Sequence, residues 1–356
     1  MAEWLPSAIE GWAVDHLKVD DVAVALHGKP RSGQSNETVP FTATWTDGRL
    51  DGVARLQPGR PMFLGGDVLR EARVLAALGE AGVRVPRVLG TVEDAPAPFF
   101  VMELVAGHVP FGRPSVQRDP WLVDLTPDRR HALWSDAMGM VVALHDSDPA
   151  GVRAVLGTTA DDETVGADVE RTASWLAWAA QDRPFPVLEQ AVEQLRMWAP
   201  TFSPSSPPVV VWGDARLGNM IVGDDLRVAA AIDWETASIG PREVDLGWWL
   251  MMDDYSSAAV GVDRLDGFPS RDDTRAFYEE RTGVRRTDLD RFELLGAVKL
   301  AITLLRTADA LVERGVIDPG SRFAHDNVPT QMVARRLGIA VPDLSPDYRR
   351  LARLDA

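Results

Sequence analysis

The sequence predicts a bilobal α+β protein, with a small antiparallel-sheet lobe that carries one key helix and a larger, mainly helical lobe. Three observations support this prediction. Over the first hundred residues, short apolar runs alternate with polar residues and with turn signals such as Asp47-Gly48, which is typical of antiparallel strands. One amphipathic segment, at residues 67–81, interrupts them. From about Gly107 the pattern changes to helical periods joined by Pro-rich connections.

We expect the first lobe to span residues 1–105 and the second to span residues 106–356, because the change of pattern falls between them. The elements expected in the first lobe are a helical lead-in, a strand meander, the amphipathic helix and two strands, at residues 1–20, 21–58, 67–81, 85–90 and 99–104. The second lobe should contain a small sheet at 209–232 and helices at 129–145, 169–180, 186–198, 246–252, 274–282, 288–314 and 321–337.

Composition excludes several classes of function. The chain of 356 residues has a formal net charge of −16, so it lacks the basic footprint that nucleic acid or an anionic membrane requires. It contains no Cys, which excludes disulfides and thiolate metal sites. The N-terminus has no basic start before an apolar run, and no apolar stretch approaches the roughly 20 residues of a membrane span. We therefore expect a cytoplasmic protein that binds neither nucleic acid nor membrane.

The most informative stretch is residues 209–235, which read VVVWGDARLGNMIVGDDLRVAAAIDWE. An apolar run at each end has the β-branched and small residues of a buried strand, and residues 223–225 form a turn signal between two shorter runs. This arrangement places Asp214, Asn219 and Asp233 on loops at the ends of buried strands. Rigid elements often hold catalytic groups in such positions.

These residue types suit phosphoryl transfer. A carboxylate at Asp214 can orient a substrate hydroxyl and accept its proton, while Asn219 and Asp233 supply the hard oxygen atoms that Mg²⁺ prefers. Arg216 would lie where a cation can meet the transferring phosphoryl group. Taken alone, Asp214 is also explained as a turn or helix cap. The ordered set favours catalysis, because four different chemical roles fall at compatible places.

Residues 211–250 resemble the aminoglycoside phosphotransferase and choline kinase-like family, which has the protein-kinase-like fold. The resemblance lies in Gly-Asp-x-Arg-x-x-Asn, Ile-Asp-Trp-Glu and Asp-Leu-Gly, and it is closest to the hydroxyacid/acyl-CoA-associated phosphotransferase subgroup. It is tight over 211–250, fair over 31–105 and loose in the helical remainder. It implies ATP- and Mg²⁺-dependent transfer of the γ-phosphate to a hydroxyl of a small molecule. In this family pattern Asp214 is the base, and Asp245 braces the catalytic loop.

The resemblance also implies a nucleotide site in the first lobe. Gly33, Ser35 and Asn36 resemble the family's phosphate loop, whose backbone N–H groups cradle phosphates. Taken alone, this loop is equally explained as a plain hairpin turn. Arg55 stands where the family has a basic residue on the third strand, and Glu71 is the candidate for its ion-pair partner. A solvated helix face is the alternative interpretation of Glu71.

Residues 100–105 resemble the hinge between the lobes. The backbone at Glu103 and Val105 would then bind the adenine edge. Two positions depart from the family pattern. Trp212 replaces a His, from which we expect the loss of a bracing hydrogen bond without loss of chemistry. Arg55 replaces a Lys, and its longer, planar head is not equivalent to an ammonium.

Several alternatives stay open at the level of sequence. A catalytically weak nucleotide-binding pseudokinase would explain the two departures, and an aminoglycoside-modifying enzyme is the competing function within the kinase class. The run at 248–252 is most simply core, although part of it would suit an apolar acceptor pocket. His145 is expected to be a packed or capping residue rather than a catalytic one. The preference for ATP over GTP and the oligomeric state are not readable from the sequence.

Overall fold

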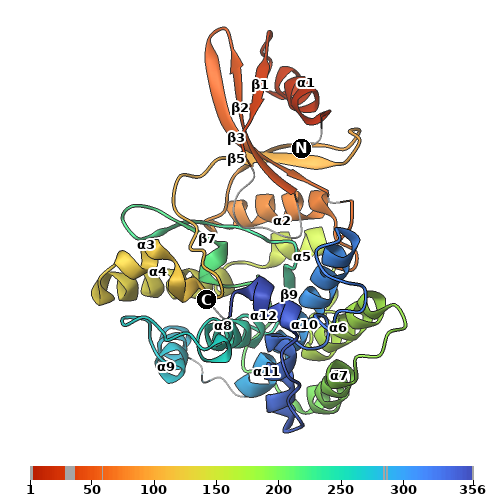
Figure 1. Cartoon of the computed structure of the whole chain (residues 1–356). Coiled ribbons are helices and arrows are strands. Elements are labelled where there is room, and N and C mark those ends of the chain that lie inside the picture. The colour runs from red at the N-terminus through yellow and green to blue at the C-terminus, as the bar shows by residue number, and fades with distance from the viewer. Residues whose placement is uncertain (1–2, 29–36, 58, 284, 286–287, 355–356) are drawn as a thin grey trace.

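The computed structural model describes residues 3–28, 37–57, 59–283, 285 and 288–354. The chain forms a small lobe that is mostly sheet and a larger lobe that is mostly helix (Figure 1). The predicted bilobal α+β architecture is therefore confirmed. Within these residues, no helix is both long and apolar enough to cross a membrane.

The small lobe is a five-stranded antiparallel sheet with the strand order β1-β2-β3-β5-β4. Its strands are β1 (Ala23–Leu26), β2 (Glu37–Trp45), β3 (Gly48–Leu56), β4 (Val88–Val92) and β5 (Phe99–Glu103). Successive residues of a strand point to opposite faces. Phe99 and Val101 therefore pack with α1 (Leu5–Leu17) on one face, and Phe100 packs toward α2 (Val68–Glu80) on the other.

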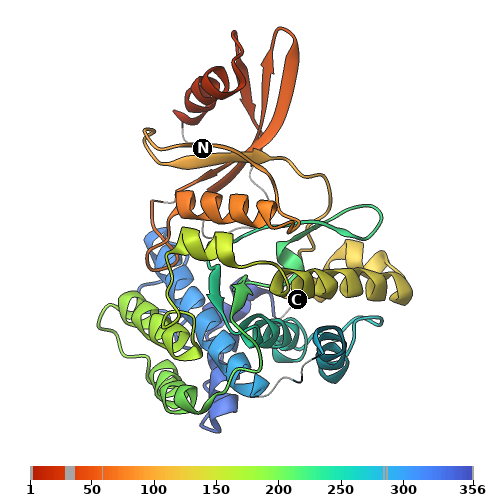
Figure 2. The same cartoon turned by 180° about the vertical axis from the view of Figure 1, so that it is seen from behind.

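Helix α2 lies between the sheet and the large lobe (Figure 1). It begins after Asp67, whose side chain caps it by accepting a hydrogen bond from the N–H of Leu69 at 2.9 Å. It ends before Gly82, which has a φ of 79° that glycine adopts without strain. From the large lobe, α5 (Ala150–Leu156) packs against α2 (Figure 2). This support fixes the helix that carries Glu71 into the cleft.

The large lobe is built around α10, which packs against α6, α7, α8 and α11. Its helices are α3 (Pro120–Asp124), α4 (Pro127–His145), α5, α6 (Val165–Ala180), α7 (Pro186–Trp198), α8 (Glu243–Tyr255), α9 (Arg271–Thr282), α10 (Leu289–Glu313), α11 (Val328–Leu337) and α12 (Pro346–Ala352). The predicted helices are all present, and α3, α5 and α12 are additional. The helix expected from residue 321 begins only at Val328, because Asn327 caps it by accepting from the N–H of Thr330.

The predicted sheet insertion is two small sheets rather than one. β7 (Met220–Val222) and β8 (Val228–Ala231) form the expected hairpin. β6 (Val209–Val211), however, pairs with β9 (Ser238–Gly240), a strand that the sequence did not predict. The pairing of β6 with β9 brings the two ends of residues 209–240 together. The loops that carry the predicted catalytic residues are therefore held from both sides.

Candidate active site

A cavity of about 1220 Å³ lies between the lobes, and we call it the cleft. Eight of the predicted site residues line it, from both lobes: Arg55, Glu71, Glu103, Val105, Asp214, Arg216, Asn219 and Asp233. The other three, Gly33, Ser35 and Asn36, lie outside the described residues. The loops of residues 209–235 therefore face the small lobe across the cleft, as predicted.

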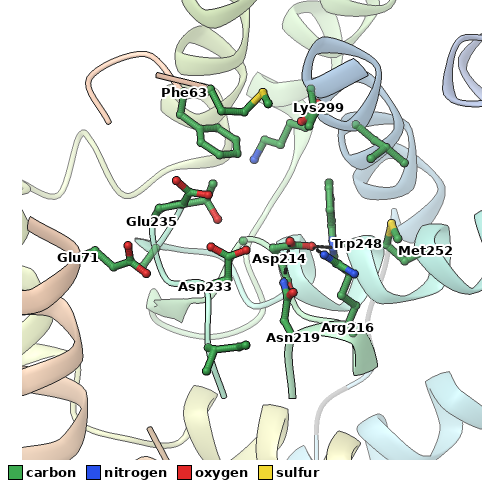
Figure 3. A pocket seen from close by; sticks show the side chains of 18 of the residues that line it. Phe63, Glu71, Asp214, Arg216, Asn219, Asp233, Glu235, Trp248, Met252 and Lys299 are labelled. Atoms are coloured by element: carbon green, nitrogen blue, oxygen red, sulfur yellow. Dashed lines mark hydrogen bonds and ion pairs between the residues drawn. The ribbon is translucent and has the colours of Figure 1, made fainter. Parts of the chain in front are cut away.

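Asp214 lies at the centre of the cleft, after β6 (Figure 3). Its Oδ1 accepts hydrogen bonds from Arg216 Nε at 2.9 Å and from Trp248 Nε1 at 3.0 Å, and its Oδ2 accepts one from Asn219 Nδ2 at 2.7 Å. Burial raises the pKa of Asp214 above its usual value, although the Arg216 guanidinium opposes this shift. The carboxylate is therefore held in one orientation by three side chains.

The turn that delivers Asp214 depends on Gly213. This residue has a φ of 85°, and a Cβ there would lie 2.7 Å from Thr236 Oγ1 and 2.9 Å from the Thr236 carbonyl oxygen. Both the backbone conformation and the close approach exclude a side chain. Glycine at this position lets the chain turn tightly from the buried strand β6 into the loop.

Asn219 and Asp233 are placed so that each offers an oxygen atom to the cleft. Asn219 is buried and uses its amide nitrogen on Asp214, which leaves Oδ1 without a donor from the described residues. Asp233 has a φ of 68° and accepts at Oδ1 from Arg55, and its Oδ2 accepts no hydrogen bond from the described chain. An amide oxygen and a carboxylate fit Mg²⁺, which commonly takes one or two protein carboxylates together with phosphate and water oxygens.

No complete protein cage for a metal is present among the described residues, since no three His, Asp or Glu side chains gather there. Two protein oxygens suffice when phosphates supply the rest. The assignment of Asn219 and Asp233 as metal ligands stays a prediction.

Arg55 and Glu71 form the predicted ion pair. Arg55 Nε donates to Glu71 Oε2 at 2.8 Å, and Nη2 donates to Asp233 Oδ1 at 2.5 Å. Burial alone would lower the pKa of Arg55, but the carboxylates of Glu71 and Asp233 outweigh it and raise that pKa. The planar guanidinium thus bridges α2 to the loop after β8, using two nitrogens in a fixed fork. Arg55 therefore ties the two lobes together.

Asp245 braces the catalytic loop, as expected. Its Oδ2 accepts from the N–H of Trp212 and its Oδ1 from the N–H of Gly213, both at 2.7 Å. His145 Nε2 lies 3.0 Å from the same Oδ2, and its Nδ1 lies 2.6 Å from the hydroxyl oxygen of Tyr278. The side chains of Trp212, Asp245, His145 and Tyr278 are buried, and Gly213 is half-buried. His145 is a packed residue, as predicted, and it also orients the bracing carboxylate.

The expectation that Trp212 costs the loop a bracing hydrogen bond is wrong. Trp212 is fully buried, and its Nε1 lies 3.2 Å from the carbonyl oxygens of both Ile232 and Asp233. Its ring stacks on Trp234 with ring centroids 4.9 Å apart. The indole therefore makes its own link between the Asp214 loop and the Asp233 loop.

The hinge side of the cleft is apolar. Glu103 ends β5, and its Oε1 accepts a hydrogen bond from the N–H of Arg87 at 2.9 Å. Val105 lies two residues further on, and Met102, Leu75, Ile221 and Ile232 also line the cleft, from both lobes. An apolar lining of this kind suits a nucleotide base. Binding of the adenine edge by the backbone at Glu103 and Val105 stays a prediction.

The opposite side of the cleft is lined by an apolar surface that the sequence prediction largely missed. We call it the apolar wall and define it as Trp248, Met252, Leu300, Leu304, Phe323 and Leu351. Trp248 and Met252 face the cleft from α8, because residues four apart share a helix face. Residues 249–251 between them are core. The four-residue spacing of Trp248 and Met252 was the signal in the sequence that distinguishes the residues lining the cleft from the core residues between them.

A loop of the small lobe, with Met62 and Phe63, also lines the cleft. The ring of Phe63 packs against Trp175 of α6 in a tilted arrangement with ring centroids 5.0 Å apart, and Trp175 Nε1 donates to the carbonyl oxygen of Met62 at 3.2 Å. Lys299 of α10 also reaches the cleft (Figure 3), where both oxygens of Asp168 hold its Nζ, at 2.7 and 3.0 Å. Its charge is therefore already paired.

Three solved structures share the fold. A Ralstonia eutropha JMP134 protein, described provisionally as an aminoglycoside phosphotransferase, is 23% identical with a TM-score of 0.64, over 92% of this chain and 98% of that one. Plasmodium vivax ethanolamine kinase is 12% identical with a TM-score of 0.56, over 94% and 87%. The aminoglycoside phosphotransferase APH(3'')-Id of Streptomyces rimosus, in complex with ADP and streptomycin, is 16% identical with a TM-score of 0.52, over 85% and 99%. These similarities confirm the kinase-like fold.

Two curated proteins are similar in sequence over part of their length. Acyl-CoA dehydrogenase family member 10 of Mus musculus is 28% identical over 226 residues, which are 61% of this chain and 19% of that protein. IBR3 of Arabidopsis thaliana, named as an acyl-CoA dehydrogenase, is 26% identical over 228 residues, which are 62% of this chain and 27% of that protein. The chain thus spans only about a fifth to a quarter of these relatives.

The model of the phosphotransferase enzyme family matches residues 29–280, which include the cleft residues of both lobes up to α8. The match covers the loops that carry Asp214, Asn219 and Asp233, whereas Lys299 and the apolar-wall residues Leu300, Leu304, Phe323 and Leu351 lie beyond it. The chain belongs to the phosphotransferase enzyme family.

Proposed function

We propose that the protein is an ATP- and Mg²⁺-dependent phosphotransferase that moves the γ-phosphate to a hydroxyl of a small molecule. The observation that carries this proposal is the convergence of Asp214, Asn219, Asp233 and Arg55 in one cleft between two lobes. Each has a separate role in phosphoryl transfer: base, metal-binding amide, metal-binding carboxylate and phosphate-neutralising cation. The solved relative that contains ADP supports a nucleotide in this cleft.

In the proposed reaction Asp214 orients the acceptor hydroxyl and takes its proton. The hydroxyl oxygen forms a bond to the γ-phosphorus while the bond from that phosphorus to the β–γ bridging oxygen breaks, and the electron pair of the broken bond leaves with ADP. Asn219 and Asp233 would hold Mg²⁺, which supplies charge neutralisation on the phosphates. Arg216, whose Nε is engaged with Asp214, places positive charge beside the transferring group. Positioning and electrostatics supply most of the catalysis.

The apolar wall bears on the acceptor. In Figure 3, Glu71 and Asp233 lie on one side of Asp214, while Trp248 and Met252 lie on the other. We assign the first side to the phosphates and the second to the acceptor. The cleft is also lined by carboxylates, at Asp162, Asp168, Glu170 and Glu235, but these lie outside the apolar wall. Asp168 and Glu170 are already paired with Lys299 and Arg196, whereas a polycationic aminoglycoside would require carboxylates at the acceptor. A hydroxylated acceptor with an apolar surface therefore fits better, and the resemblance to the hydroxyacid/acyl-CoA-associated subgroup agrees. With ATP as donor, the cytoplasm is the proposed compartment.

Consumption of ATP by the whole chain, with a panel of hydroxyacids, simple alcohols and aminoglycosides as acceptors, tests the proposal. We expect acceptor-dependent formation of ADP that requires Mg²⁺ and that Asp214→Asn abolishes. Asp224→Asn is the matched control, because Asp224 lies in the exposed β7–β8 turn. Robust turnover of kanamycin would replace the apolar acceptor with an aminoglycoside. Binding of ATP without turnover on any acceptor would favour the pseudokinase.

A further inference from the structure

Trp248 makes a contact that no sequence motif predicts. Its indole Nε1 donates to Asp214 Oδ1 at 3.0 Å, across 34 residues of sequence. We infer that Trp248 is a positioning residue: together with Arg216 it saturates Oδ1 of Asp214 and leaves Oδ2 to receive the acceptor's proton. The proton transfer in this inference rests on the proposed function, whereas the hydrogen bond from Trp248 to Asp214 does not depend on it.

The two oxygens of the Asp214 carboxylate differ in how many donors they already accept from. Each oxygen of a carboxylate has about two acceptor sites. Oδ1 of Asp214 already accepts from two donors, Arg216 Nε and Trp248 Nε1. Oδ2 accepts from one, the amide nitrogen of Asn219, so one site stays open. An acceptor hydroxyl therefore finds its partner at Oδ2, beside the residue that offers its own Oδ1 to the metal.

Helix α8 holds both the backbone of the loop at residues 212–213 and the side chain of Asp214. Asp245 and Trp248 are three residues apart and so lie on the same face of the helix. Asp245 binds the backbone N–H groups of Trp212 and Gly213, and Trp248 binds the side chain of the next residue, Asp214. One helix thus fixes the loop backbone and the orientation of the base.

Close packing keeps the Trp248 ring in place. A Cβ at Gly247 would lie 2.5 Å from the Cβ of Phe292, and a Cβ at Gly296 would lie 3.4 Å from Trp248 Cε3. These glycines let α8 and α10 approach closely, so the indole has little room to withdraw. Trp248 is only 7% exposed although it lines the cleft. Its ring therefore serves as wall for the acceptor while its N–H holds the base.

The substitution Trp248→Phe removes the N–H and keeps an aromatic wall. The matched control is Trp249→Phe, in which the same change is made one residue away in the core, where the indole N–H has no partner among the described residues. We expect Trp248→Phe to lower kcat about ten- to hundredfold, the worth of one hydrogen bond to a charged group. KM for ATP should stay within about twofold of wild type. A kcat equal to that of Trp249→Phe would overturn the inference.

A second readout is independent of turnover. The chain has 12 Trp residues, so labelling of indole nitrogens with ¹⁵N gives few N–H signals, and the signal lost in Trp248→Phe identifies Trp248. We expect that signal far downfield in the wild type and shifted upfield by Asp214→Ala, while the Trp249 signal stays in place. An unchanged chemical shift of the Trp248 indole N–H in Asp214→Ala would overturn the inference. A wild type without turnover would refute the proposed function and leave this test intact.

Discussion

The substitution Asp245→Asn tests how strongly the catalytic loop depends on its brace. The carboxylate accepts from two backbone N–H groups, the buried one of Trp212 and the half-buried one of Gly213, and contacts His145. An amide has one acceptor oxygen, so its NH₂ group must face one of those two N–H groups in either orientation. The variant loses one charge-assisted hydrogen bond, worth about 1.5–3 kcal/mol, and leaves one buried donor unsatisfied, at about 1–3 kcal/mol.

We therefore expect the free energy of unfolding of the large lobe to fall by about 3–5 kcal/mol, in line with other broken buried pairs. Urea unfolding followed by circular dichroism measures this loss. Asp254→Asn is the control on the same helix, because the side chain of Asp254 is 40% exposed and makes only a long ion pair with Arg336, at 3.4 Å. This substitution should change the free energy of unfolding by less than about 1 kcal/mol. A loss below about 1 kcal/mol in Asp245→Asn would refute the role of this brace.

Three further predictions follow from the contacts around the cleft. Trp212→Phe should lower the free energy of unfolding by about 1–2 kcal/mol, because the indole N–H holds two backbone carbonyls of the neighbouring loop; urea unfolding would show no change if that link is idle. Glu71→Gln should raise KM for ATP about tenfold or more, since Arg55 loses a charged partner; an unchanged ATP titration would contradict the phosphate role of Arg55. Burial would raise the pKa of Asp168, but Lys299 outweighs it and holds the pKa low. Ion pairing of this carboxylate therefore stabilises the fold above its unfolded pKa of about 3.9 and is lost as pH falls through the lowered value. Lys299→Met should then lower the thermal midpoint at pH 7 and lower it less as the pH falls to 3; an equal loss at both pH values would contradict this account.

The sequence predicted the fold where local periodicity and burial agree. The alternation at residues 39–45 and the helical period at residues 67–81 are visible in the chain itself, and both segments form the expected elements. The helices α3, α5 and α12 escaped because they have five to seven residues, too few to show a helical period. Strand β9 escaped because three residues, Ser238 to Gly240, carry no strand signal of their own.

For the site, the sequence located residues that share a short stretch, and it missed those whose partners are distant. Asp214, Asn219 and Asp233 end buried strands within one segment, so local pattern was enough. Trp248 contacts Asp214 only because α8 folds back onto the loop. The indole bonds of Trp212 likewise depend on how two loops meet. Such contacts belong to tertiary structure and leave no periodic signal.

In the proposed function, Asp214 accepts the proton of the acceptor hydroxyl during phosphoryl transfer, in a cleft that binds ATP and Mg²⁺. A single-turnover experiment with ATP labelled in the γ-phosphate, and with the best acceptor of the panel, tests it most directly. We predict label on the acceptor hydroxyl with the wild type, and at least about a hundredfold slower transfer with Asp214→Asn at an unchanged ATP affinity. Transfer at the wild-type rate by Asp214→Asn would contradict the account.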